Sequence, residues 1–85
     1  MPIRILIADD HAVVRSGLRA LLSSDSDIEV VGEAADGAET LHRAATLRPD
    51  LVLLDITMPH ESGIRVAQRL KEAHPAIKVL FLTMH

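Results

Sequence analysis

Four short apolar runs recur along this chain, and amphipathic segments separate them. The runs have the length of strands and are rich in isoleucine, valine and leucine, which is typical of parallel strands covered on both faces. The second run alternates more than the others and is expected nearer an edge. The predicted strands cover residues 3–8, 28–34, 51–55 and 77–82. The sequence therefore predicts an α/β protein with a parallel sheet.

The three segments between the runs carry apolar residues at helical spacing. They predict helices at about 11–24 and 38–47, and a third that starts after an N-cap at Ser62 and stops before Pro75. The inward positions that the spacing predicts are Val14, Leu18, Leu21 and Leu22, then Ala38, Leu41 and Ala45, then Ile64, Ala67, Leu70 and Ala73. The order is βαβαβαβ, a doubly wound sheet with predicted strand order 2-1-3-4 in one small domain spanning 1–85.

Composition excludes several classes of function. Phe81 is the one aromatic residue, and the net charge is −3, so neither base stacking nor a basic nucleic-acid surface is expected on this segment. The sequence has no cysteine, which excludes disulfides and thiolate metal sites. No apolar run approaches about 20 residues, and the start does not resemble a signal peptide. We expect a soluble domain of the cytoplasm that makes no contact with a membrane.

Carboxylates follow two of the apolar runs. Asp9 and Asp10 come after the first, and Asp55 ends the third. Because strand order 2-1-3-4 makes these strands neighbours, the three side chains are expected to converge where ligands bind in such sheets. Three hard oxygen ligands favour Mg²⁺ over zinc or copper. An alternative stays open, in which Asp9 and Asp10 cap the following helix.

Three further residues lie near the predicted site. The carbonyl of Thr57 is expected to reach a metal, and Thr83, after the fourth run, offers a hydroxyl to a phosphoryl oxygen or to local backbone. Gly63 is expected to permit an unusual backbone angle where the loop enters the third helix. Of the five histidines, His11 is the one expected to line the crevice.

Several motifs resemble one family, the receiver domains of bacterial response regulators, and the NarL/FixJ-type transcriptional regulators above all. They cover the chain in the right order. The matching runs are Ile5 to His11, Val13 to Leu18, Val31 to Ala34, Asp36-Gly37, Arg48 to Asp50 and Leu53 to Pro59. The resemblance implies a flavodoxin-like (CheY-like) receiver fold.

The resemblance also implies roles for the residues of the site. Asp55 would be the phosphoacceptor, which receives its phosphoryl group from a phosphohistidine on a sensor histidine kinase. Asp10 would bind Mg²⁺ directly, Asp9 through the metal's waters, and Thr57 through its carbonyl. Thr83 would be the switch hydroxyl. The chain would be a signalling module that controls transcription, and not an enzyme.

The chain also departs from the family pattern. Receiver domains of this family are longer, and their fifth strand supplies a lysine for the phosphoryl group; Lys71 and Lys78 stand at the wrong positions to replace it. We therefore expect the N-terminal portion of a receiver domain, with a DNA-binding helix-turn-helix output domain outside this chain. Run 77–82 would then be an exposed edge, which predicts a homodimer or a swapped oligomer.

Two alternative functions remain open from the sequence. A Mg²⁺-dependent phosphohydrolase could use the same strand-end aspartate, but the nucleotide type needs a P-loop, which this sequence lacks, and the aspartyl-phosphate type needs an acid at position 57, which is Thr57. A flavodoxin-like binding module without phosphorylation would need neither.

Overall fold

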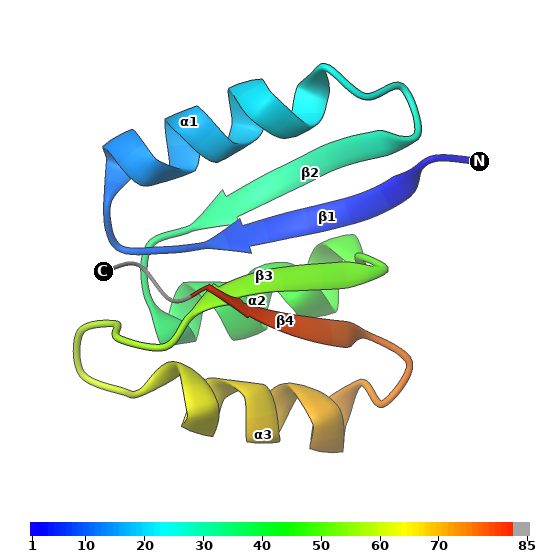
Figure 1. Ribbon diagram of the computed structural model, residues 1–85. Coiled ribbons are helices and arrows are strands. Elements are labelled where there is room, and N and C mark those ends of the chain that lie inside the picture. Colours follow the sequence, from blue (N-terminus) through cyan, green and yellow to red (C-terminus); the bar gives the residue numbers. More distant parts are fainter. Residues whose placement is uncertain (83–85) are drawn as a thin grey trace.

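The structure is a computed structural model, and it describes residues 1–82. It contains the seven elements that the sequence predicts, in the same order (Figure 1). The strands are β1 (Ile3–Ala8), β2 (Ile28–Ala34), β3 (Leu51–Asp55) and β4 (Lys78–Leu82). The helices are α1 (Ala12–Ser23), α2 (Gly37–Leu47) and α3 (Gly63–Ala73). The prediction for Thr83 lies outside the described residues.

The four strands form one parallel sheet in the order β2-β1-β3-β4, which confirms the predicted topology. β1 and β3 lie side by side at its centre, and β2 lies at an edge, as its alternating pattern predicted. All strands run in the same direction, so their carboxyl ends gather at one side of the molecule (Figure 1). No helix of the described residues is long and apolar enough to span a membrane.

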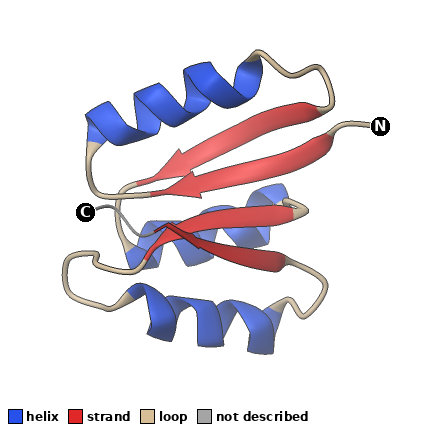
Figure 2. Ribbon diagram, in the orientation of Figure 1, coloured by secondary structure: helices blue, strands red, loops and turns tan. Residues whose placement is uncertain are grey.

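The helices cover the two faces of the sheet unequally. α2 and α3 share one face, and α1 packs on the opposite face, within residues 1–82 (Figure 2). The larger core lies on the α2–α3 face and contains Leu6, Val52, Leu54, Val66 and Leu70. On the α1 face, Leu18 and Leu22 pack on a smaller core of Ile5, Ile7 and Leu53.

Some predicted helix faces are wrong by part of a turn. Leu21 of α1 is 70% exposed, and Ala38 and Ala45 of α2 point to solvent, whereas Thr40 and Ala44 are buried. In α3, Ile64 and Ala73 are exposed and Val66 is buried instead. Alanine and short apolar repeats define a stripe poorly, because neighbouring positions on a helix satisfy the same spacing.

A register shift in β2 changes which side chains face α1. Ile5 pairs with Val30, but the next residue, Leu6, pairs with Gly32, so Val31 is an extra residue of the kind that makes a β-bulge. Before the bulge, Val30 faces α1; after it, Ala34 lies in the core of the opposite face. The bulge thereby turns Glu33 toward α1.

β4 is the exposed edge that the sequence predicted for run 77–82. Its apolar residues alone indicate a buried strand, but Leu80 is 55% exposed and Phe81 is 40% exposed. It is an outer strand of the sheet, and among the described residues α1 lies at the far edge, beside β1 and β2 (Figure 1). The apolar run therefore identified the strand, and the predicted strand order identified it as an exposed edge.

Candidate functional site

The candidate site lies at the carboxyl ends of β1 and β3. Ala8 pairs with Leu54, so Asp9 and Asp55 occupy the next position along two adjacent strands. One ligand atom from each of Asp9, Asp10, His11 and Asp55 lies within 4.8 Å of the others. The predicted convergence of the three carboxylates is thus what the structure contains, with His11 as a fourth member.

Asp9 is buried at the end of β1, and its two carboxylate oxygens differ. Oδ1 accepts hydrogen bonds from the backbone N–H of His11 at 2.8 Å and from its Nδ1 at 3.0 Å. Oδ2 is buried and has no hydrogen-bond partner among residues 1–82. A buried carboxylate oxygen without a hydrogen-bond partner is costly, so a cation or a donor at this atom would stabilise it.

Asp10 presents a second oxygen of this kind. Its Oδ1 is buried and lies 2.9 Å from Nδ1 of His11, but in a direction that makes no hydrogen bond. The exposed His11 imidazole is attracted to both carboxylates. Its pKa is raised, chiefly by the hydrogen bond to Asp9 and then by the charge of Asp10.

Asp55 ends β3 and is 5% exposed. Its Oδ1 accepts from the backbone N–H of Thr57 at 3.1 Å and from the Thr57 hydroxyl at 3.3 Å. These bonds orient the carboxylate and hold the loop that follows the strand. The expected metal-binding role of the Thr57 carbonyl stays a prediction.

Gly63 fixes the other end of this loop. Its N–H donates to the Ile56 carbonyl at 2.6 Å, and a Cβ at this position would collide with the Asp55 carbonyl oxygen. Its φ is not positive, so the expected unusual backbone angle is wrong. Glycine is needed here for close approach to the strand that carries Asp55. The predicted N-cap of α3 is confirmed, since the Ser62 hydroxyl accepts from the N–H of Arg65 at 3.3 Å.

The donor set of the site fits Mg²⁺. Three carboxylates supply hard oxygen ligands, and Asp9 and Asp10, whose buried oxygens make no hydrogen bond, lie within the cluster. The capping alternative does not explain these oxygens. The N-cap of α1 is His11, without a side-chain cap, and Asp9 bonds to His11 itself.

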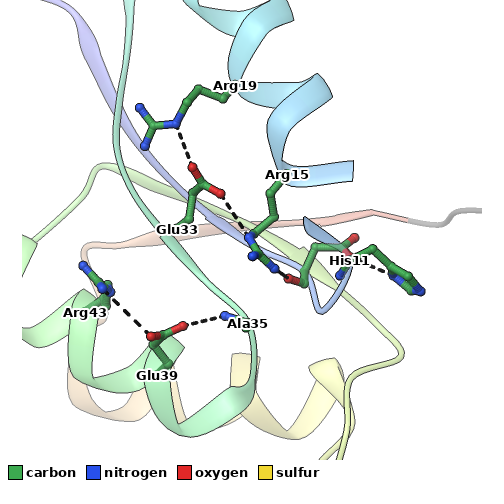
Figure 3. A network of polar contacts seen from close by, with 8 residues as sticks. His11, Arg15, Arg19, Glu33, Ala35, Glu39 and Arg43 are labelled. Carbon is green, nitrogen blue, oxygen red and sulfur yellow. Dashed lines mark hydrogen bonds and ion pairs between the residues drawn. The ribbon is translucent and has the colours of Figure 1, made fainter. Parts of the chain in front are cut away.

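Sequence reasoning missed Arg15, which joins α1 to this site. Its Nε donates to Glu33 at 3.0 Å and its Nη1 to the Asp9 carbonyl at 2.6 Å. Arg19 donates to the other oxygen of Glu33 at 2.8 Å (Figure 3). Both arginines lower the pKa of Glu33, Arg19 most strongly. The available signal was the polar stripe of α1, but its acidic partner was not predictable without the bulge in β2.

Comparisons with known proteins identify the family. Residues 5–85 match the response regulator receiver domain. The chain is 47% identical over 83 residues to the response regulator VraR of Staphylococcus aureus, and this match covers 98% of the chain and 40% of VraR. It therefore spans less than half of this relative's length.

Solved structures of response regulators also resemble this chain. The receiver domain of the response regulator NarL from Mycobacterium tuberculosis superposes with a TM-score of 0.92 at 36% identity, covering 99% of this chain and 68% of that one. RcsB from Salmonella enterica serovar Typhimurium, bound to a promoter in the presence of the phosphomimetic BeF₃⁻, superposes with a TM-score of 0.91 at 29% identity. This match covers 99% of this chain and 43% of the RcsB chain. These relatives do not favour the hydrolase or bare flavodoxin-like alternatives. The fold, the strand-end acids and these matches together show that the chain belongs to the receiver domains of two-component response regulators, of NarL type.

Proposed function

We propose that Asp55 is the phosphoacceptor of this receiver domain. The observation that carries the proposal is its position: the Asp55 carboxylate lies beside Asp9 and Asp10, each of which has a buried oxygen without a hydrogen-bond partner among the described residues. Three carboxylates at such distances repel one another unless a cation is bound. A site of this kind is suited to a phosphoryl group that arrives together with a metal.

The reaction would be a phosphoryl transfer from a phosphohistidine. A carboxylate oxygen of Asp55 attacks phosphorus, the N–P bond breaks, and its electron pair returns to the imidazole of the kinase. Thr57 holds Oδ1 of Asp55, which orients the carboxylate for attack. Thr83 would donate its hydroxyl to the transferred group.

Mg²⁺ is the metal that we propose for the site. Asp10 would bind it directly, Asp9 through water, and Asp55 and the Thr57 carbonyl would complete the protein ligands. When bound, the ion neutralises charge on the phosphoryl oxygens in the transition state. Oxygen ligands and room for waters and phosphate are what Mg²⁺ prefers in proteins.

The partners follow from the family. Receiver domains of response regulators interact with sensor kinases, and we propose a sensor histidine kinase in the cytoplasm as the phosphodonor. Because RcsB is a relative bound to a promoter, we propose DNA as a target reached through an output domain beyond this chain. Chain 1–85 would be the N-terminal portion of the receiver. As an isolated chain, we propose that it assembles with a second copy through β4, where Leu80 and Phe81 are exposed.

The test uses a small phosphodonor. The protein is incubated with acetyl phosphate and Mg²⁺, and its intact mass is measured; the expected result is a gain of one phosphoryl group that Asp55→Ala abolishes. The matched control is Asp50→Asn, just before the opposite end of β3, which should be modified like the wild type. An unmodified wild type, or an Asp55→Ala variant that gains the same mass, would overturn the assignment.

A further inference from the structure

Arg15 holds the main chain that presents the two acidic residues of β1. The peptide groups of Asp9 are tied on both sides: its N–H donates to the Ala34 carbonyl at 3.0 Å, and its carbonyl accepts from Nη1 of Arg15 at 2.6 Å. That carbonyl belongs to the peptide between Asp9 and Asp10. Its orientation therefore helps to set where the Asp10 carboxylate lies.

The guanidinium of Arg15 is itself held in place. Its side chain is 18% exposed, and Nε is bonded to Oε1 of Glu33 at 3.0 Å. Glu33 accepts a second bond from Arg19 at its other oxygen, so it is fixed from two sides (Figure 3). A planar fork that donates in two directions can join a carboxylate to a carbonyl, which an ammonium group does less well.

We propose that Arg15 is a positioning residue for the cation site: by bridging Glu33 to the Asp9 carbonyl, it holds the Asp9–Asp10 turn in the geometry that binds Mg²⁺. This inference rests on the proposed function. Arg15 does not touch the metal ligands' carboxylate oxygens in the described contacts, and it acts through the backbone. The β2 bulge contributes to the same network of contacts, because it brings Glu33 to the α1 face.

The charge of Arg15 and its geometry make opposite predictions for how the loss of this side chain changes Mg²⁺ affinity. Removing a positive charge near the acidic cluster would by itself strengthen cation binding. Releasing the Asp9 carbonyl would weaken it, because residues that orient metal ligands typically contribute about 10–100-fold to metal affinity. Arg19 supplies the matched control, since it carries the same charge and binds the same glutamate but makes no contact with Asp9 among the described hydrogen bonds.

The experiment is a titration of the 85-residue protein with Mg²⁺ alone. Binding is monitored by calorimetry and by the NMR shifts of the backbone amides of Asp9 and Asp10. We expect Arg15→Gln to raise the dissociation constant for Mg²⁺ roughly tenfold. Arg19→Gln should leave this constant unchanged or lower it slightly. Arg15→Lys keeps the charge but loses the fork, so it should bind as weakly as Arg15→Gln. Thermal melting of each variant ensures that folded protein is compared, and Arg15→Lys replaces Arg15→Gln if the latter does not fold.

Two outcomes would overturn the inference while leaving the proposed function in place. One is equal Mg²⁺ affinity in Arg15→Gln and Arg19→Gln; the other is full rescue by Arg15→Lys, which would show that the planar fork bridging Glu33 to the Asp9 carbonyl is not needed. A wild type that binds no Mg²⁺ in this titration would overturn the proposed metal site and the positioning role together.

Discussion

Gly63 shows most directly how a single residue constrains the site. A methyl group there would meet the Asp55 carbonyl oxygen and lie 2.8 Å from Cα of Ile56, both of which are backbone atoms. We expect Gly63→Ala to lower the free energy of unfolding by about 2–3 kcal/mol, as overpacking against rigid neighbours does. Urea denaturation followed by circular dichroism measures this change.

Gly17 is the control for this substitution. It lies within α1 and an added Cβ would have nothing within 4 Å, so Gly17→Ala should stabilise the protein by about 0.5–1 kcal/mol through helix propensity. If both glycine variants changed stability in the same direction, the close approach of Gly63 to β3 would not be what requires glycine there.

Among single residues, the acids of the site were predictable from the sequence, and the residues that hold those acids in place were not. Asp9, Asp10 and Asp55 follow apolar runs, and the rule that strand ends gather at one edge was enough to bring them together. The need for Gly63 arises from a contact between two loop ends, and no local pattern encodes that distance. Arg15 was indistinguishable from any polar residue on an exposed helix face.

Among the elements, β2 and α1 are joined by the Glu33–arginine network, which predicts a pH dependence. Arg19 and then Arg15 lower the pKa of Glu33 below its ordinary value of 4.5. A depressed carboxyl pKa stabilises the folded state above the unfolded pKa, and this contribution is lost as the pH falls through the folded pKa. We expect Glu33→Gln to cost about 0.5–1 kcal/mol at pH 7, and less below about pH 4.

Chemical denaturation at pH 7 and at pH 3.5 measures this difference. Glu29→Gln is the control, since Glu29 is an exposed residue of the same strand with no ion pair among residues 1–82. A cost of Glu33→Gln that stays constant between the two pH values would contradict the ion-pair explanation.

Element boundaries followed from the sequence more closely than element faces did. Apolar runs and breakers such as Pro49 and Pro75 placed all seven elements within about two residues, because they act locally. The bulge at Val31 could not be predicted in this way, and a strictly alternating strand would have put Glu33 on the wrong face. At β4 the apolar run alone indicated burial, and the exposure of the strand followed instead from its predicted place at the end of strand order 2-1-3-4.

For the whole molecule, the unequal covering of the sheet predicts self-association. β4 is an outer strand among residues 1–82, and it exposes Leu80 on one face and Phe81 on the other. Its free backbone groups and apolar side chains form a template for another strand, and natural sheets protect such edges with charged residues. We expect the 85-residue chain to be a dimer or a larger swapped oligomer in multi-angle light scattering.

Leu80→Lys should shift this equilibrium toward monomer, because an edge lysine opposes pairing and Leu80 is 55% exposed on this outer strand. Leu21→Lys is the matched control: Leu21 is 70% exposed, but it lies on α1, away from the edge. If the two lysine variants dissociated alike, general surface hydrophobicity would explain the association better than β4 does. A sharp monomer peak for the wild type, with cooperative melting, would show that the exposed strand is tolerated without a partner.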